Sequence, residues 1–464
     1  MQTFDVAIVG AGPAGMSAAI EAADHGLRVA LLDEQSSPGG QIYRGVNGVG
    51  AERAKLLGDD YAYGRTLTSR VLRGGLEYFH GAVVWSIENG FRISYTRDGK
   101  ASGLTADRVV LATGALERPM PIPGWTLPGV MTAGAGQIFM KQSGIVAQNA
   151  VLVGTGPLLY LVAAQMIRFG APPVALVETQ TQADLIRAAK YAAGAVRGWR
   201  YLRKGLSLLA EIKRAGVPRY RAATRLLIEG TDRAQAVQFH SDGHEHRIAC
   251  DTVFLHHGVV PNTQAARALR VPHAWDDAQA CFVPKVDGWG MTDVDGLFIA
   301  GDSAGIGGAR TAELAGRMTA LRLADLAGRL TVPDRDHTAA PLRAALQTDR
   351  AVRPFLNAAY PPYTGALTPD DATIICRCEE VTAGDIRRYA QMGCEGPNQT
   401  KAFGRVGMGP CQGRYCGLSV TALLADAHRR PPDDIGYYRI RPPLKPVTLG
   451  ELAAMPQPDP EGEI

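Results

Sequence analysis

The sequence predicts an α/β protein with two nucleotide-binding units of the same pattern and a small helical unit near the C-terminus. Three observations support this fold class: a glycine-rich turn between two apolar strands near the N-terminus, a second copy of that pattern near the middle of the chain, and two cysteine pairs in its last quarter. The chain has 464 residues, 46% hydrophobic and 20% charged, so it can bury two or three separate cores.

The first pattern spans residues 5–34 and predicts a strand, a glycine turn, a helix over 14–25 and a second strand over 29–32. In Rossmann folds this turn lets the backbone approach a pyrophosphate, and the helix N-terminus faces the phosphates. Asp33 follows the second strand where such folds place a carboxylate on a ribose, and Glu34 lies beside it. A purely structural turn does not account for this acid. The turn residues that we expect at the nucleotide are Gly10, Gly12, Pro13, Ala14 and Gly15.

Composition excludes several function classes. The formal charge is only +4 and the basic residues are scattered, so we expect no nucleic-acid partner. The first strand begins by about residue 4, which leaves no room for a signal peptide, and we expect a cytoplasmic location. Residues 150–167 are uncharged, but Gly154, Gly156 and Pro157 interrupt them, so a buried α/β unit is expected and no transmembrane segment. Five of the seven cysteines lie from Cys376 onward, which favours metal ligation over disulfides.

Several later motifs resemble those of the flavoproteins with two dinucleotide-binding domains, the class of glutathione and thioredoxin reductases. The loop at 38–42 resembles their FAD-contacting GG motif, the strand at 82–85 their adenine strand, the turn at 112–114 their ATG turn, and the strand ending at 301–302 their second FAD fingerprint. The order of these motifs supports the assignment, although an apolar strand that ends in glycine is common. The resemblance implies FAD contacts by Gly40, Gln41, Val83, Ala112, Thr113, Gly114, Gly301 and Asp302.

Disulfide reduction is disfavoured for this chain. The disulfide-reducing members of that class carry a cysteine pair soon after the GG loop or in the second nucleotide domain. Residues 44–50 contain no cysteine, and the first cysteine of the sequence is Cys250.

The second copy of the pattern runs from residue 150 to Glu178, an acid that lies 24 residues after Gly154, against 23 in the first copy. Leu159 stands where the third glycine is expected, so we expect the helix to sit farther from the strand and to alter the pyrophosphate pocket. Two interpretations stay open. In the first, Gly154, Gly156 and Glu178 form a site for NAD(P)H, and the acid favours a free ribose. In the second, the domain is kept for packing or binds a non-redox adenine nucleotide such as ATP.

Neighbouring histidines follow in the same unit. His256 and His257 are adjacent on an expected strand, so their side chains point to opposite faces and cannot bind one metal together. Packing is the better interpretation for both.

The C-terminal unit contains a C-x-C pair and a C-x4-C pair separated by 32 residues. Thr382 and Asp385 predict a capped helix that runs to residue 392, and a second helix is expected over 418–428. Structural zinc sites prefer ligand pairs two to four residues apart, which fits this spacing poorly. The unit resembles the bacterioferritin-associated-ferredoxin type of domain, which implies a [2Fe–2S] cluster; zinc and unliganded thiols are the alternatives. The implied ligands are Cys376, Cys378, Cys411 and Cys416, whereas Cys250, Cys281 and Cys394 are expected to be buried free thiols.

Together, the stretches ATGALERP, TDVDGLFIAGD and CRCEE…MGPCQGRYC resemble one family over almost the whole chain. This is the large flavoprotein subunit of heteromeric amine dehydrogenases such as the opine oxidases and the D-hydroxyproline and proline dehydrogenases, with the B subunit of hydrogen cyanide synthase as a near relative. The resemblance implies that a separate FAD-dependent, amino-acid-oxidase-like beta subunit oxidises the amino or imino acid.

The same resemblance implies that this chain passes electrons on through FAD and the cluster, often with FMN at the subunit interface and with a small ferredoxin-like gamma subunit as a further partner. No catalytic residue for C–H oxidation is therefore expected here. Two rival functions remain: a stand-alone NAD(P)H-dependent flavin and iron-sulfur reductase, and a scaffold without catalytic activity.

The motifs divide the chain into six expected segments. These are the first part of an FAD domain (1–117), a second nucleotide-binding domain (118–264), the second part of the FAD domain (265–335), a connector (336–370), an iron-sulfur domain (371–430) and a C-terminal tail (431–464).

Overall fold

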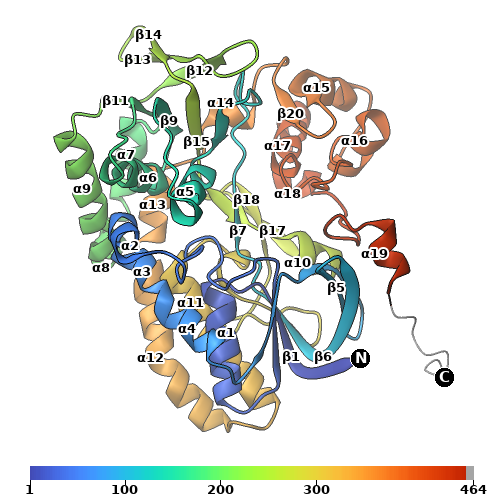
Figure 1. Cartoon of the computed structure of the whole chain (residues 1–464). Helices are drawn as coiled ribbons and strands as arrows, with labels where there is room; N and C mark the ends of the chain where they lie inside the picture. Colours follow the sequence, from blue (N-terminus) through green and yellow to red (C-terminus); the bar gives the residue numbers. More distant parts are fainter. Residues whose placement is uncertain (456–464) are drawn as a thin grey trace.

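The computed structural model describes residues 1–455 and has the predicted α/β fold, built around two sheets (Figure 1). In the seven-stranded first sheet the order is β3-β2-β1-β6-β5-β4, with β19 beside β6. The pairs β3-β2, β2-β1, β1-β6 and β6-β19 are parallel, and β4 and β5 continue the sheet as an antiparallel extension. The strands are β1 (Gln2–Val9), β2 (Val29–Asp33), β3 (Glu77–His80), β4 (Val83–Ile87), β5 (Arg92–Arg97), β6 (Lys100–Leu111) and β19 (Leu297–Ile299).

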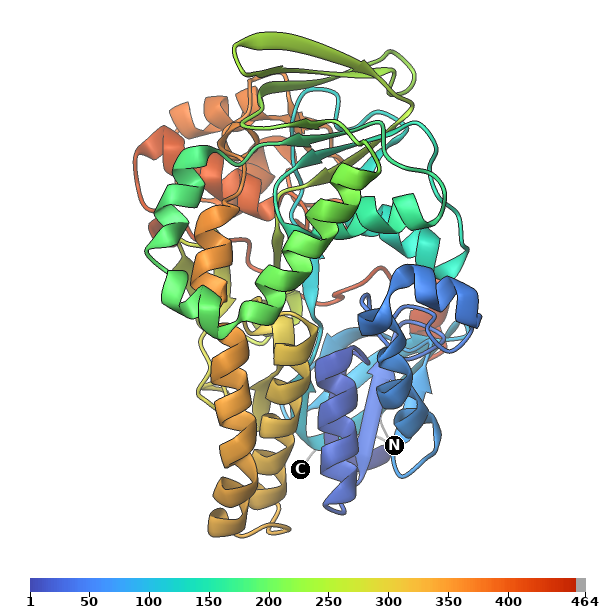
Figure 2. The ribbon, with the colours of Figure 1, turned by 90° about the vertical axis from the view of Figure 1, so that its left-hand side faces the viewer.

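Helices from distant parts of the sequence pack on one face of this sheet. α1 (Pro13–Asp24) lies beside α11 (Ala309–Leu326), and α12 (Val332–Arg350) continues the layer (Figure 2). α1 and α11 approach so closely that a Cβ at Gly316 would lie 2.1 Å from the carbonyl oxygen of Ala14. β2 is buried along its whole length, as expected for a central strand with both faces covered. The first half of the FAD unit predicted from the glycine turn therefore packs directly on its second half.

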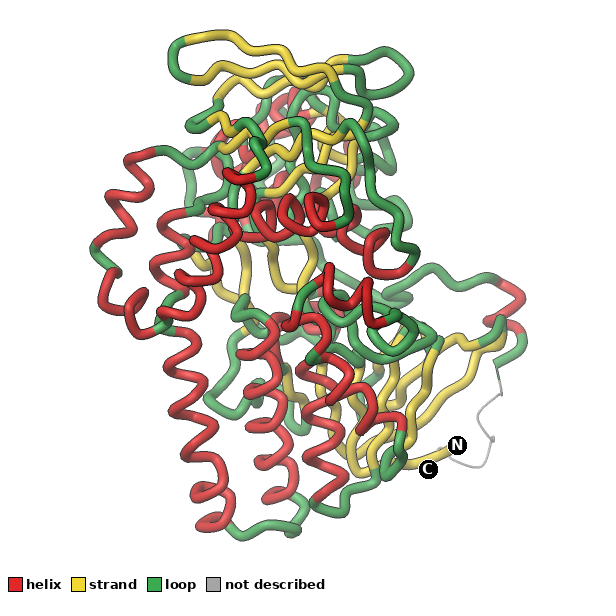
Figure 3. The backbone as a smooth tube through the Cα atoms, turned by 60° about the vertical axis from the view of Figure 1, so that its left-hand side comes forward, coloured by secondary structure: helices red, strands yellow, loops and turns green. Residues whose placement is uncertain are grey.

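The second sheet has five parallel strands in the order β11-β10-β9-β15-β8. The uncharged stretch 150–167 forms β9 and α6, so the prediction of a buried α/β unit is confirmed. An antiparallel sheet, β12-β13-β14, covers one end of this unit (Figure 3). The strands are β8 (Val130–Thr132), β9 (Ala150–Gly154), β10 (Ala175–Glu178), β11 (Arg219–Tyr220), β12 (Thr224–Glu229), β13 (Ala236–Ser241), β14 (His244–Ala249) and β15 (Thr252–His256).

Helices surround the second sheet and join it to the rest of the molecule. They are α5 (Ala133–Gln142), α6 (Pro157–Arg168), α7 (Gln182–Ala189), α8 (Ala192–Arg197) and α9 (Trp199–Arg214), with α13 (Arg353–Ala359) and α14 (Thr364–Leu367) from the expected connector. The two-stranded ladder of β7 (Ala115–Glu117) and β16 (Val259–Pro261) links the two sheets. Short elements near the first sheet are α2 (Ala51–Leu57), α3 (Asp59–Ala62), α4 (Gly64–Leu72), α10 (Gln264–Ala268), β17 (His273–Asp276), β18 (Cys281–Pro284) and the 3-10 turn η1 (Gly301–Ser303).

The C-terminal unit is mainly helical. The Thr382 side chain accepts the N–H of Asp385, whose carboxylate accepts the N–H of Thr382, which confirms the predicted capped helix. The second predicted helix, 418–428, is also confirmed. The elements are β20 (Ile374–Cys376), β21 (Val381–Thr382), α15 (Ala383–Gln391), α16 (Pro397–Gly404), α17 (Gly417–His428), α18 (Pro432–Ile435) and α19 (Leu449–Ala453).

The segment expected only as a C-terminal tail, 431–464, lies in part outside the described residues. Its described part is packed: Tyr438, Ile440 and Leu444 are buried, and the N–H of Leu444 donates to the carbonyl oxygen of Trp85 in β4. The chain thus returns from the C-terminal unit to the first sheet. None of the helices within residues 1–455 has the length and apolar run needed to cross a membrane.

Candidate functional site

The first glycine turn joins β1 to α1 and leaves space at only one of its three glycines. A Cβ at Gly10 would lie 2.4 Å from the carbonyl oxygen of Ala112, and one at Gly15 only 1.8 Å from that of Gly10. At Gly12 the nearest atom would be the Cα of Gly40, 3.9 Å away. Gly12 is also the N-cap of α1 and makes no side-chain cap, so the free N–H groups of the helix can face an anion here.

Asp33, expected at a ribose, holds the glycine turn. Its Oδ2 accepts the N–H of Ala11 at 2.5 Å and its Oδ1 accepts the N–H of Gln35 at 2.8 Å. Burial raises the pKa of this carboxyl above its ordinary value, although the two N–H groups oppose the shift. The neighbouring Glu34 is exposed and forms an ion pair with Lys445 at 2.8 Å. The sequence does not point to Lys445 as a neighbour of Glu34, because Lys445 comes from the returning C-terminal segment.

The second fingerprint lies directly against the first. A Cβ at Gly301 would be 2.6 Å from the Cβ of Ala14. Asp302 follows, and its Oδ1 accepts the N–H groups of Gly307 and Gly308 at 2.8 and 2.9 Å, just before α11. Within residues 1–455 nothing donates to its Oδ2. Asp302 therefore orders the loop before α11 and keeps one acceptor oxygen for a ligand.

The remaining FAD candidates surround this pair. Gly40 packs on the glycine turn, since a Cβ on it would lie 2.8 Å from the Cα of Gly12. Val83 begins β4 directly after Ala82, whose N–H donates to the carbonyl oxygen of Asp33. The structure therefore brings the GG loop, the adenine-strand candidate and the end of β2 together.

The 112–114 turn is tied to the end of the second unit. The hydroxyl of Thr113 donates to the carbonyl oxygen of Asn262 at 3.1 Å, and the N–H of Asn262 donates to that of Gly114 at 2.9 Å. This places the turn where the chain passes between the two sheets.

A buried lysine connects the GG loop to α5. Lys141 Nζ donates to the carbonyl oxygen of Gln41 at 3.0 Å and to the side-chain oxygen of Gln137 at 2.8 Å. Burial, assisted by the charge of Arg44, lowers the pKa of Lys141 to about 7. The sequence does not single out Lys141, because one lysine on an amphipathic helix is not a motif.

The second glycine turn has a histidine beside it. A Cβ at Gly154 would lie 1.8 Å from the carbonyl oxygen of His256, and one at Gly156 would lie 3.3 Å from the Nε2 of that histidine. His256 Nδ1 is 2.6 Å from Oε1 of Glu117, whose Oε2 accepts the N–H of Gly134. His257, which follows the end of β15, instead lies 2.7 Å from the carbonyl oxygen of Pro119, so the two histidines contact different groups.

Other polar groups at this turn have no partner among the described residues. The buried hydroxyls of Thr155 and Thr179 are unpaired there, as is the side-chain oxygen of Gln180. Leu159, at the third glycine position, is buried in the apolar core that joins the two units. Whether the helix stands farther from the strand, as its size suggested, remains a prediction.

Glu178 is fully buried and its carboxylate is already occupied. Oε1 accepts hydrogen bonds from the Tyr160 hydroxyl at 2.5 Å, the Gln180 amide at 2.8 Å and the Arg219 guanidinium at 2.9 Å, and Oε2 accepts a second bond from Arg219 at 3.0 Å. Tyr360, from the connector, packs on Tyr160 with ring centroids 6.1 Å apart. A ribose that used this carboxylate would have to displace protein donors.

The four C-terminal cysteines come together as two pairs. Cys376 ends β20 and hydrogen-bonds Cys416, which precedes α17, while Cys378 lies beside Cys411. The hydrogen bond from Cys416, with backbone N–H groups of three loop residues, lowers the pKa of Cys376 to about 6. The donor set thus fits a group bound by four thiolates. Gly409 lets its loop approach Cys378 closely, because a Cβ there would lie 2.2 Å from that of Cys378.

The paired arrangement differs from a site for one ion. Within residues 1–455 no three His, Cys, Asp or Glu side chains converge as ligands of a single metal ion. The other three cysteines are buried free thiols, as predicted; they are Cys250, Cys281 and Cys394.

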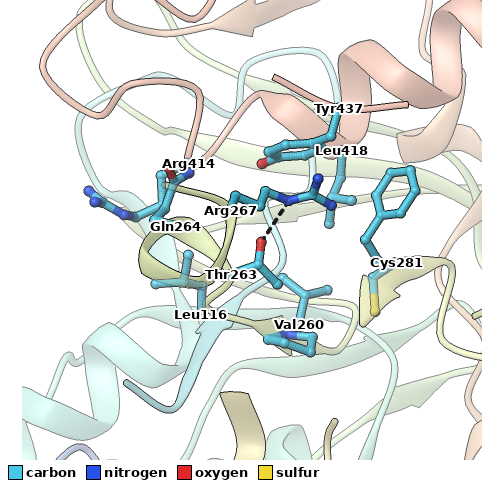
Figure 4. A pocket seen from close by; sticks show the side chains of 11 residues that line it. Leu116, Val260, Thr263, Gln264, Arg267, Cys281, Arg414, Leu418 and Tyr437 are labelled. Atoms are coloured by element: carbon cyan, nitrogen blue, oxygen red, sulfur yellow. Dashed lines mark hydrogen bonds between the residues drawn. The ribbon is translucent and has the colours of Figure 1, made fainter. Parts of the chain in front are cut away.

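An aromatic and arginine seam joins the C-terminal unit to the rest of the chain (Figure 4). The guanidinium of Arg267 lies 4.2 Å from the ring centroid of Tyr437 and 4.8 Å from that of Phe282, and its Nε donates to the Thr263 hydroxyl. The adjoining cavity holds about 20 Å³, room for roughly one water molecule and too little for an amino acid. We identify this seam as a structural contact. The sequence did not predict it.

Comparisons with known proteins cover the whole chain. Residues 4–319 match the family model described as pyridine nucleotide-disulphide oxidoreductase, and residues 371–456 match that of the sarcosine oxidase A3 domain. The A subunit of the opine oxidase from Rhizobium meliloti (strain 1021) is 41% identical over 99% of this chain and 100% of its own length. The HcnB subunit of hydrogen cyanide synthase from Pseudomonas protegens is 30% identical over 98% of each chain.

Among solved structures, the L-proline dehydrogenase from P. horikoshii is similar with a TM-score of 0.72. The match covers 97% of this chain and 79% of that one at 19% identity, so it supports the fold alone.

Proposed function

Because the chain belongs to the pyridine nucleotide-disulphide oxidoreductase family and is a relative of the opine oxidase and hydrogen cyanide synthase flavoproteins, we propose that it is the electron-transferring flavoprotein subunit of a heteromeric dehydrogenase that oxidises an amino or imino acid. The resemblance stated from the sequence motifs is thereby confirmed. One observation carries the proposal. The same chain contains two adjoining nucleotide fingerprints, at the first glycine turn and at Gly301, and two pairs of cysteine thiols.

The first unit is the proposed FAD site. Gly12 offers open space at the N-terminus of α1, where the N–H groups favour a pyrophosphate, and Asp302 keeps an acceptor oxygen for a ribityl hydroxyl. Asp33 would act mainly by holding the glycine turn, which leaves Glu34 as a candidate for the ribose. Bound FAD would supply the two-electron chemistry, and these residues would bind and orient it.

The C-terminal thiols are the proposed ligands of a [2Fe–2S] cluster: Cys376, Cys378, Cys411 and Cys416. Such a cluster is held by four thiolates, and the C-x-C and C-x4-C spacing fits it better than it fits the ligand pairs of structural zinc sites. The cluster would supply a one-electron carrier. The backbone N–H groups directed at the sulfur of Cys376 favour its thiolate form.

The partner assignments follow from the relatives, two of which are named as subunits. We propose that an FAD-dependent, amino-acid-oxidase-like beta subunit takes hydride equivalents from hydroxyproline, proline or an opine, that FMN lies at the subunit interface, and that a small ferredoxin-like gamma subunit completes the complex. A cytoplasmic location is proposed with it.

A second candidate is a stand-alone NAD(P)H-dependent reductase, favoured by the unpaired hydroxyls at the second glycine turn. The occupied carboxylate of Glu178 argues against it. An adenine nucleotide without a redox role, such as ATP, remains compatible with the unpaired groups.

The test of the main proposal is co-expression of the chain with an amino-acid-oxidase-like gene from its own genomic neighbourhood. A co-purified complex should reduce an artificial dye when proline, hydroxyproline or an opine is added. The present chain without its partner should not reduce the dye with these substrates. A chain that copurifies with no oxidase and reduces dye with NADH alone would support the reductase instead.

A further inference from the structure

The helices α7, α8 and α9 form a protruding surface that none of the functions above uses. They occupy residues 182–214, beside the second sheet, on the side of the molecule away from the C-terminal unit (Figures 1 and 2). We call this segment the α7–α9 surface. Six of the 21 exposed large hydrophobic side chains of the described chain belong to it: Leu185, Ile186, Tyr191, Val196, Trp199 and Leu206. Such a concentration of exposed apolar side chains in one segment indicates an interaction site.

The same segment is strongly basic, so the basic residues are less evenly scattered along the chain than was expected. It contains eight Lys and Arg but only two acids, a net charge of +6, whereas the whole chain carries +4. Both acids are paired, Asp184 with Arg187 and Glu211 with Arg168. Within residues 1–455 five of the basic residues have no salt bridge: Lys190, Arg197, Arg203, Lys213 and Arg214. Every unpaired charge of the α7–α9 surface is therefore positive.

Helix α9 shows how the two properties combine. Trp199, Arg203, Leu206 and Lys213 follow one another at helical spacing and share one face. Trp199 is 57% exposed and Leu206 68%, whereas Leu208 on the opposite face is buried. The guanidinium of Arg203 lies 5.0 Å from the Trp199 ring centroid, so charge and aromatic surface are presented together.

We propose that the α7–α9 surface binds anionic phospholipid bilayers, as a peripheral membrane contact. A helix with Trp and Leu on the outer face and Lys and Arg beside them suits the headgroup boundary, where the apolar groups enter the acyl region and the cations meet lipid phosphates. A protein partner fits less well, because the cores of protein interfaces are depleted of charged residues, whereas the apolar side chains here stand among unpaired cations. The inference does not depend on the proposed electron-transfer function.

The contact would fix the orientation of the chain on a membrane. Since the C-terminal unit lies on the opposite side of the molecule, it would be held away from the lipid (Figure 1). A partner could therefore approach that unit while the chain stays bound.

The purified full chain is tested by flotation with vesicles of pure phosphatidylcholine and with vesicles in which a third of the lipid is phosphatidylglycerol. Binding is expected only to the second kind and should weaken as salt is added. Arg203→Gln with Lys213→Gln removes two unpaired charges and should lower the bound fraction at least about tenfold, since each surface cation contributes about fivefold. Leu206→Ser should weaken binding that persists in high salt.

The matched controls are Arg73→Gln with Arg430→Gln, two exposed arginines elsewhere, and Leu72→Ser, whose side chain is 57% exposed. These variants should bind like the unaltered chain. Absence of phosphatidylglycerol-dependent binding, or equal binding by the α7–α9 variants and their controls, would overturn the proposal. It would also be overturned if the α7–α9 variants float normally but fail to assemble with a co-expressed partner chain, because the surface would then be a protein interface.

Discussion

Arg219 pairs with Glu178 through two hydrogen bonds, at 2.9 and 3.0 Å, and so neutralises a carboxylate that has no exposed surface. The pair lies at the end of β10, where the second nucleotide domain was expected to bind a ribose. The two hydrogen bonds therefore stabilise a buried charge in the interior of the protein.

The Arg219→Leu variant should therefore be strongly destabilised. It leaves a buried charge without its partner, and we expect the free energy of unfolding to fall by about 3 kcal/mol in urea titrations. Arg70→Leu breaks the exposed pair with Asp24 and should cost less than about 1 kcal/mol. Adding Glu178→Gln to Arg219→Leu should recover part of the loss. Equal effects of Arg219→Leu and Arg70→Leu would contradict the buried-charge argument.

The Gly12→Val variant should lose FAD without losing the fold. A Cβ at Gly12 meets only the Cα of Gly40, at 3.9 Å, so the side chain would project into the space expected for the pyrophosphate. Asp302→Ala should also lower FAD occupancy, because it removes the remaining acceptor oxygen. The ratio of flavin to protein absorbance measures both, with circular dichroism as the control for folding. If both variants keep full FAD occupancy, the assignment of the FAD site is wrong.

The purified chain should contain about two irons and two acid-labile sulfides. Cys378→Ser or Cys411→Ser should remove both, because each breaks one thiol pair. Cys250→Ser and Cys394→Ser, at buried thiols outside the pairs, should retain them. Iron and sulfide assays decide between the alternatives: zinc in stoichiometric amount without sulfide would make the C-terminal unit a structural zinc site.

Lys141 should make stability depend on pH. Its pKa is about 7 in the folded protein against 10.5 in the unfolded chain, so the unfolded chain binds more protons between these values and stability rises with pH across that window. Below pH 7 Lys141 is charged in the folded protein too, so the full free-energy cost of burying that charge is present. Between pH 7 and 9, Lys141→Met should abolish a gain of up to about 1 kcal/mol per pH unit, whereas the exposed Lys55→Met should keep it. Thermal unfolding at pH 7 and pH 9 measures this effect. If stability changes equally with pH in the unaltered chain, Lys141→Met and Lys55→Met, the prediction is wrong.

Local patterns account for the parts of the molecule that the sequence predicted. The glycine turn, the strands around it and Asp33 lie within 30 residues, and the Thr382–Asp385 cap within four. The unpredicted contacts join distant segments. Trp125 donates to the carbonyl oxygen of Ile374, 249 residues away, and so ties the second unit to the strand of Cys376. No residue pattern encodes such a pair, because only the folded topology brings its members together.

The hydrogen bonds of Asp33 also depend on the folded structure. Spacing correctly indicated an acid at the end of β2, but not that both of its oxygens would accept backbone N–H groups. That outcome depends on how the turn packs, which a spacing rule does not contain.

The isolated chain should leave its flavin oxidised when it is mixed with NADH. Hydride transfer needs the reacting atoms roughly 3 to 3.5 Å apart, and two features oppose such an approach at the second site: Leu159 at the third glycine position and a ribose acid held by Arg219 and Tyr160. Amino acids alone should also leave the flavin oxidised, because we propose that their oxidation takes place on a partner subunit. Stopped-flow spectra should show bleaching by an amino acid only when the oxidase-like partner is present.

The sharper comparison is Glu178→Gln with Arg219→Gln, which removes both charges at this ribose position. If NADH bleaches the unaltered chain rapidly and this double variant slowly, the second domain is a working nicotinamide site and the flavin-reductase function replaces the one proposed here.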